Sequence, residues 1–142
     1  MDLVQLLYEL GCTLPTEERF GLRIQLQRAG VSIPANLAEG HSRRSRGAFA
    51  NHVSIALGSQ AELETLLELC KRLTLGDSEL LARCERCAVE IGKMLYGLHN
   101  SLERSRKRGL LYSIVLVPFS VCTLAASLWY LASGLWPLTS GP

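Results

Sequence analysis

The chain has 142 residues, 48% of them hydrophobic, and a formal net charge of only +2. This length suits one modest domain, and the whole-chain charge argues neither for nor against a nucleic-acid partner. The five cysteines are an odd number and follow no signal peptide, which argues against an extracellular disulfide framework and indicates a reducing, cytoplasmic setting.

The first two helices are predicted from apolar spacing. Residues 3–10, LVQLLYEL, predict a short apolar helix that ends near Gly11. The turn TLPTEERF follows, and its two glutamates suit the first turn of a second helix, where the helix dipole is positive. This second helix is expected to run to about Gly40, with an apolar stripe of Leu22, Leu26, Ala29, Ile33 and Leu37.

Two longer helices with heptad-like stripes are expected next. Ser42 or Ser45 can cap the third helix, whose stripe is Phe49, Val53, Ala56, Gln60, Leu63, Leu67 and Cys70. Asp77 or Ser78 can cap the fourth, whose stripe is Leu81, Cys84, Ala88, Ile91, Leu95, Leu98 and Leu102. No stretch alternates with period two. The pattern therefore predicts an all-α protein, with an antiparallel up-down-up-down four-helix bundle over residues 1–105.

Pro34 interrupts the second helix, where it removes the hydrogen bond to the carbonyl of Gly30. The small residues around it leave space for a kink and for close approach of another backbone. Two interpretations stay open, a kinked helix in a tight bundle and a ligand pocket at the kink.

Catalytic and metal-binding patterns are weak in this sequence. The lone CERC motif pairs Cys84 with Cys87, which favours a place in the core over a metal or redox site, because zinc needs four ligands. The three histidines are dispersed, although His41 could add a phosphate contact beside the arginines. We therefore expect no enzyme, no metal site and no cofactor.

Three motifs in order, RAGVSIPANLAEG, RRSR and GSQAELE, carry a family resemblance centred on residues 14–73 and extending over residues 3–102. The chain resembles the four helix bundle protein family, also called the 23S rRNA-intervening sequence proteins, whose bacterial members are related to the accessory protein of diversity-generating retroelements. The resemblance assigns structural-motif roles to Arg28, Pro34, Asn36, Glu39, Gly40, Gly58, Ser59 and Glu62.

The resemblance implies a left-handed bundle that assembles as a ring-shaped homopentamer, with no enzymatic activity. Its retroelement relatives bind nucleic acid and a reverse transcriptase, so RNA, DNA and such an enzyme become candidate partners. Three features depart from the family: a shorter first helix, Leu57 in place of an arginine, and the C-terminal tail. We expect Glu39 and Glu62 to pair with helix arginines such as Arg28.

All charged residues lie within residues 1–108, and residues 110–138 are almost wholly apolar. About 20 apolar residues suffice to span a bilayer. The preceding basic linker, residues 106–109, and the aromatic residues near the far end are typical of a cytoplasmic flank and an interfacial belt. A membrane span that tethers the bundle to the inner membrane is the favoured interpretation. An out-of-frame extension and a replacement for the short first helix are the alternatives.

The bundle topology is expected to gather basic residues at one end, because the turn between helices two and three lies beside the end of helix four. Three interpretations of this end compete: a solvated face, a contact with anionic lipid headgroups, and phosphate binding to RNA or DNA. Against the last, no aromatic residue interleaves the arginines in the sequence to stack bases. The predicted cluster comprises Arg43, Arg44, Arg46, Arg104, Arg106, Lys107 and Arg108.

Overall fold

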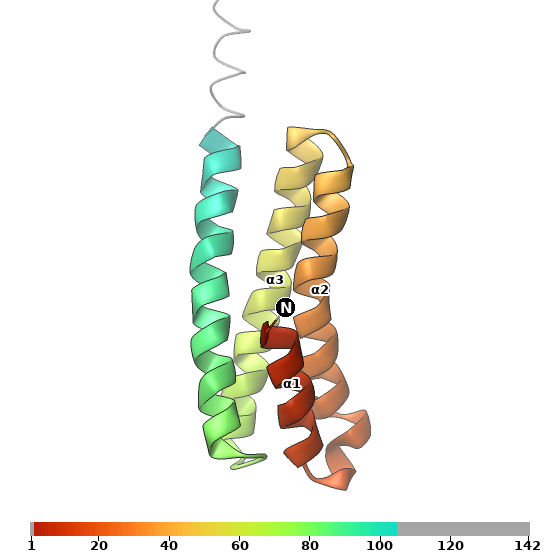
Figure 1. The fold of residues 1–142 in the computed structure, drawn as a ribbon, viewed down its shortest axis with the longest axis vertical. Coiled ribbons are helices and arrows are strands. Elements are labelled where there is room, and N and C mark those ends of the chain that lie inside the picture. Colours follow the sequence, from red (N-terminus) through yellow and green to blue (C-terminus); the bar gives the residue numbers. More distant parts are fainter. Residues whose placement is uncertain (1, 105–142) are drawn as a thin grey trace, which may run out of the picture. The chain divides into compact units, whose positions relative to one another are not determined.

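A computed structural model describes residues 2–104, which contain four α-helices, a 3-10 helix and no β-strand (Figure 1). The elements in chain order are α1 (Asp2–Thr13), η1 (Thr16–Phe20), α2 (Leu22–Ser42), α3 (Arg46–Arg72) and a fourth α-helix over residues 78–104, called helix 78–104 below. Successive helices run in opposite directions. The predicted all-α, up-down-up-down bundle is therefore confirmed for this part of the chain.

Side-chain caps fix the starts of the two longest helices. The Ser45 hydroxyl accepts a hydrogen bond from the backbone N–H of Ala48 and caps α3. The Asp77 carboxylate accepts from the N–H groups of Glu79 and Leu80 and caps helix 78–104. Of the two caps proposed for each helix, the structure selects Ser45 and Asp77. Ser42 instead donates to the carbonyl of Glu39 and helps to end α2.

The start of the second helix differs from the prediction. The glutamate pair lies in the separate 3-10 helix η1, and α2 begins only at Leu22, after a break at Gly21. The Glu18 carboxylate reaches past this break and accepts the N–H of Leu22 at 3.2 Å. Glu18 therefore stabilises the positive end of α2 from outside the helix, in place of forming its first turn.

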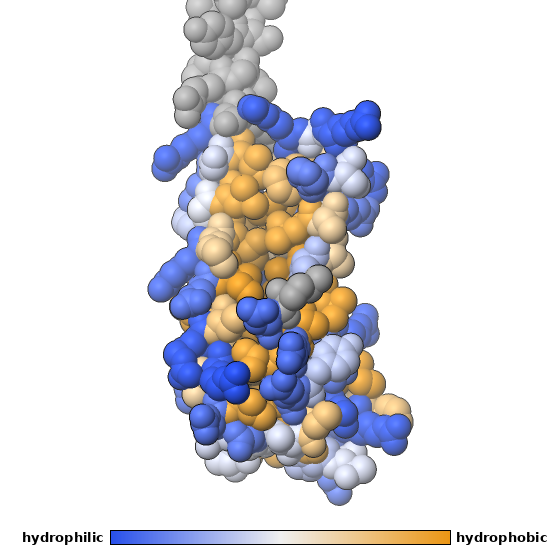
Figure 2. Space-filling model, in the orientation of Figure 1, coloured by the Kyte–Doolittle hydropathy of each residue, from blue (hydrophilic) through white to orange (hydrophobic). Residues whose placement is uncertain are grey.

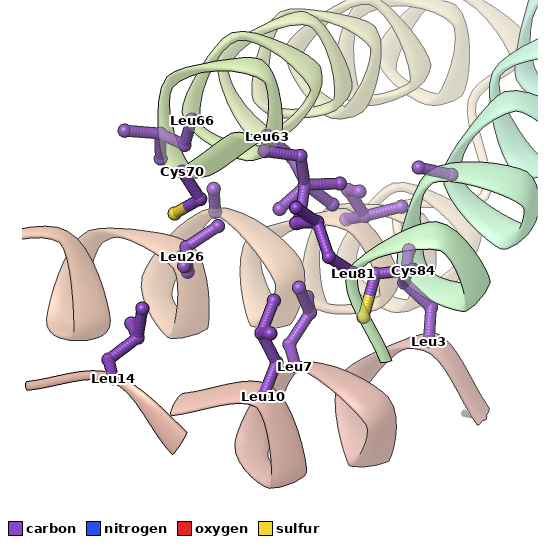
Figure 3. Packing of buried hydrophobic residues seen from close by; sticks show 14 of the residues in the cluster. Leu3, Leu7, Leu10, Leu14, Leu26, Leu63, Leu66, Cys70, Leu81 and Cys84 are labelled. Carbon is purple, nitrogen blue, oxygen red and sulfur yellow. The ribbon is translucent and has the colours of Figure 1, made fainter. Parts of the chain in front are cut away.

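The core is built from the predicted stripes. Leu26, Ala29 and Ile33 of α2 are buried, as is every stripe position of α3 except the half-buried Phe49. Leu7 and Leu10 point from α1 into this cluster, toward α2 and α3 (Figure 3). The four helices thus share one hydrophobic core, to which α1 contributes buried leucines.

Gln60 is the one polar residue among the buried positions of residues 2–104. Its Nε2 donates to the carbonyl of Ala88 at 2.6 Å and to the Glu64 carboxylate at 3.0 Å. Gly92 leaves room for it, since a Cβ there would lie 3.2 Å from the same nitrogen. A polar residue in a heptad seam favours one register, so Gln60 fixes how α3 pairs with helix 78–104.

Two motif glycines have opposite surroundings, which gives a matched pair of tests. A Cβ at Gly40 would lie 2.5 Å from the Cβ of His52, whereas a Cβ at Gly58 would meet nothing within 4 Å. We expect Gly40→Ala to lower the free energy of unfolding by about 1–3 kcal/mol, because α2 and α3 must separate. Gly58→Ala is expected to raise it by about 0.5–1 kcal/mol, since alanine favours a helix.

Urea unfolding followed by circular dichroism measures the free energy of unfolding of both glycine variants. Equal effects of the same sign would contradict the view that Gly40 permits a close helix crossing.

No helix within residues 2–104 is both long and apolar enough to cross a bilayer. The basic linker and the apolar segment, which carry the membrane prediction, lie outside the described residues.

Candidate functional site

The connection between α2 and α3 lies at the same end of the bundle as the end of helix 78–104 (Figure 1). Arg43 follows α2, Arg44 occupies the turn and Arg46 begins α3, while Arg104 is the last described residue of helix 78–104. We call this set of four arginines the basic end. The structure thus places the predicted residues that it describes at one end of the bundle. Arg106, Lys107 and Arg108 lie outside the described residues.

Arg43 differs from the other arginines of the connection because a carboxylate neutralises it. It donates to Glu39, four residues earlier on α2. This hydrogen bond and the nearby His52 hold the pKa of Glu39 below its usual value. Glu39 therefore pairs with an arginine as expected, but the partner is Arg43 and not Arg28. Across residues 2–104, no carboxylate forms an ion pair with Arg44 or Arg46, so both present an unneutralised charge.

Arg44 has a backbone conformation that residues other than glycine, asparagine and aspartate rarely adopt. Its φ is 52°, in the left-handed region. Such a conformation at a charged, exposed residue costs stability, on the order of 1 kcal/mol. The turn therefore carries a strained residue whose exposed side chain is cationic, a combination that often marks a functional position.

A hollow of about 130 Å³ lies at this connection, which we call the α2–α3 hollow. The rings of His41 and Phe49 meet edge to face in it, with centroids 6.0 Å apart. No aromatic residue interleaves the arginines in the sequence, but the fold places these two rings in the same hollow as Arg44 and Arg46. Phe49 is three residues beyond Arg46, so the first turn of α3 brings its ring back beside the arginines. The residues lining the hollow are Gly40, His41, Arg44, Ser45, Arg46 and Phe49.

Other motif residues form a polar ladder between α2 and α3. The Ser32 and Ser59 hydroxyls lie 2.8 Å apart, and Asn36 donates from Nδ2 to the Ser32 carbonyl. The Oδ1 of Asn36 lies 3.3 Å from Nδ1 of His52. These contacts join the two helices, which is the structural role that the motif predicts for Asn36 and Ser59.

Arg28 and Glu62 line one polar groove of about 310 Å³ between α2 and α3. Within residues 2–104 no ion pair joins Glu62 to Arg28 or to another arginine, so the expectation that Glu62 pairs with a helix arginine is wrong.

An apolar groove is the second prominent feature of the surface. At 1.5 Å per residue, the 12 residues of α1 cover about 18 Å, whereas the 21 residues of α2 extend for about 32 Å. Beyond the start of α1, none of the described helices covers a hydrophobic surface that faces the viewer in Figure 2. It holds a cavity of about 280 Å³, lined by Leu3, Val4, Gly30, Ile33, Pro34, Leu37, Ile91, Met94, Leu95 and Leu98. Pro34 therefore lines a cavity, which the pocket interpretation of this proline requires.

The cysteine motif has the character of a core element. Cys84 is fully buried, and its burial raises the pKa of the thiol to about 11. A protonated, buried thiol is a poor metal ligand and a poor nucleophile. The predicted core role of Cys84 is confirmed. Within residues 2–104 no group of His, Cys, Asp and Glu side chains gathers in a way that could hold a metal ion.

Comparisons with known proteins place this fold. The model of the family described as 23S rRNA-intervening sequence protein matches residues 1–97. A crystal structure of a protein of unknown function from the S23 ribosomal protein family of Bacteroides thetaiotaomicron is similar, with 30% sequence identity and a TM-score of 0.63. The match covers 70% of this chain and 89% of that one. Among the curated proteins, none matches the chain significantly.

Proposed function

Because the chain belongs to the 23S rRNA-intervening sequence protein family, we propose that it is a non-enzymatic interaction protein that binds nucleic acid through its basic end. The function of the similar S23-family protein is unknown. The proposal therefore rests on the geometry of this chain's own residues.

The charge at the basic end is the observation that carries the proposal. Arg44 and Arg46 are exposed and unneutralised among the described residues, and Arg104 is exposed at the same end of the bundle. Guanidinium groups form strong, often bidentate, hydrogen bonds with phosphates, and each such contact releases a condensed counterion. At the opposite end, Lys71 and Arg72 are instead paired with Glu85 and Glu68. This asymmetry favours one end as the binding surface.

The proposal includes a homo-oligomer, with the pentamer that the family resemblance implies. The outer faces of α2 and α3 carry the exposed apolar residues Ile24, Val31 and Ile55. Such residues suit close contact between copies. A ring would repeat the basic end in every copy and multiply its charge. Native mass spectrometry of the full chain measures the number of copies, and a monomer at all concentrations would contradict this part.

A second candidate function, a membrane-tethered scaffold that binds protein or lipid, is favoured by the apolar groove. A groove of about 280 Å³ lined by aliphatic side chains suits an apolar helix or an acyl chain. The sequence of the apolar segment 110–138, outside the described residues, supports a membrane location for the same candidate.

A pair of titrations separates the two candidate functions. The full chain in mild detergent is titrated with fluorescent RNA and, separately, with a fluorescent fatty acid. Binding of RNA that survives Met94→Glu, a substitution at the exposed edge of the groove, supports the first candidate. Binding of the fatty acid alone, abolished by Met94→Glu, supports the second and removes the first.

The strained turn offers a prediction that separates stability from binding. Asparagine tolerates the left-handed region, so we expect Arg44→Asn to raise the free energy of unfolding by about 0.5–1 kcal/mol. The same substitution removes a phosphate contact and is expected to weaken RNA binding several-fold. Thr74 has the same φ of 52° at the opposite end and is the matched control. Thr74→Asn should stabilise the protein equally and leave RNA binding unchanged, and weaker RNA binding by both variants would contradict a local role for Arg44.

A further inference from the structure

The α2–α3 hollow combines two kinds of side chain that recognise different parts of a nucleotide. Arg44 and Arg46 offer guanidinium groups that suit a phosphate, and His41 and Phe49 offer rings that suit a base. We infer that the hollow takes one unpaired nucleotide of a single-stranded nucleic acid, with its phosphate on the arginines and its base against the rings. This inference rests on the proposed function and specifies its ligand.

The geometry of the two rings leaves a stacking surface. Their planes are inclined by 74°, so one ring presents its edge to the other. An edge contact leaves the faces of the ring that supplies the edge uncovered by its neighbour. A base in the hollow can therefore stack on one of the two rings.

The chain positions this ring pair by close packing. A Cβ at Gly40 would lie 3.0 Å from Cδ2 of Phe49, so the missing side chain lets the Phe49 ring lie against α2. His41 lies in the last turn of α2 and Phe49 in the first turn of α3, and the two helices meet at Arg44. The rings and the guanidinium groups are thus held on both sides of one short turn.

Double-stranded nucleic acid suits the arginines and rings of the α2–α3 hollow less well than a single strand does. In a duplex both faces of each base are covered by neighbouring bases, so a ring in a hollow cannot stack on them. The arginines alone would bind duplex phosphates, and the rings would add nothing. Rings beside arginines therefore favour a single strand over a duplex.

The test compares Phe49→Leu with wild type in binding a fluorescent single-stranded RNA and a duplex of the same sequence. The substitution keeps an apolar side chain against Gly40, so the fold is retained. We expect the affinity for the single strand to fall by about 5- to 20-fold, because one base loses its stacking partner, and the affinity for the duplex to change less than about twofold.

Phe20→Leu is the matched control, since Phe20 is an exposed ring beside Arg19 at the opposite end of the bundle. It should leave both affinities unchanged. Equal effects of Phe49→Leu on single strand and duplex, or no effect on either, would overturn this inference and leave the proposed function standing. Failure of the wild-type chain to bind any nucleic acid at low salt would instead remove the proposed function, and this inference with it.

Discussion

Replacing Leu7 by alanine is expected to lower the free energy of unfolding by about 3–4 kcal/mol. Leu7 is fully buried, and its Cδ1 atom occupies the space in which a Gly30 side chain would lie, only 2.3 Å from an ideal Cβ at that glycine. The glycine backbone cannot move in to fill the cavity left by the variant without shifting α2. Because α1 has only 12 residues and is held to the core by leucines, the loss is large for so short a helix.

Urea unfolding measures this loss, and Leu69→Ala provides the control. Leu69 is 41% exposed on α3, so its truncation should cost less than about 1 kcal/mol. Hydrogen exchange gives a second readout. Relative to wild type, Leu7→Ala should accelerate the exchange of the α1 amides more than that of the α3 amides. Similar losses for Leu7→Ala and Leu69→Ala would contradict the packing of α1 onto the core.

Removing three charges from the basic end is expected to have the largest effect on binding. The triple variant Arg43→Ala, Arg44→Ala and Arg46→Ala should bind single-stranded RNA about 10- to 100-fold more weakly at low salt, because each phosphate contact and its counterion release are lost. The slope of log affinity against log salt should become smaller by about 1.4, since Arg44 and Arg46 are the unneutralised residues of the three and each lost contact on a single strand contributes about 0.7. Fluorescence anisotropy measures both quantities.

A second triple variant controls for the change in net charge. Arg19, Lys71 and Arg72 lie at the opposite end of the described bundle, and their replacement by alanine removes the same number of positive charges. Its affinity for RNA should change less than about threefold, because surface charges more than a Debye length away are screened. Equal losses in the two triple variants would show that binding follows net charge and not the basic end.

Much of the fold could be predicted because heptad spacing carries the information. The stripe from Val53 to Cys70 is buried throughout, and the buried residues of helix 78–104 belong to the predicted stripe. For α3 and for helix 78–104, the sequence limits the N-cap to two candidate residues each, since serine and aspartate are strong caps. The family resemblance is confirmed by the family model that matches residues 1–97. Its motifs are informative because they contain residues at helix crossings, such as Gly40, which lies against His52.

The parts that were not predicted lie at the ends of helices and in the turns between them. The glutamates before α2 suited a helix start, and only the structure separates η1 from α2 with Glu18 acting across the break. Glu39 and Arg43 are spaced by four residues across the end of α2, a signal that could have identified the partner of Arg43. The meeting of His41 with Phe49 depends on the angle of the turn, for which the sequence holds no comparable signal.

The central claim is that the basic end binds nucleic acid through phosphate contacts. The most direct test is the affinity of the full wild-type chain for a labelled single-stranded RNA at about 50 and about 200 mM salt. If three or more phosphates are contacted, the affinity should fall by about tenfold or more between these concentrations. No binding at the lower concentration, or binding that does not change with salt, would contradict the claim and leave the apolar groove as the surface to pursue.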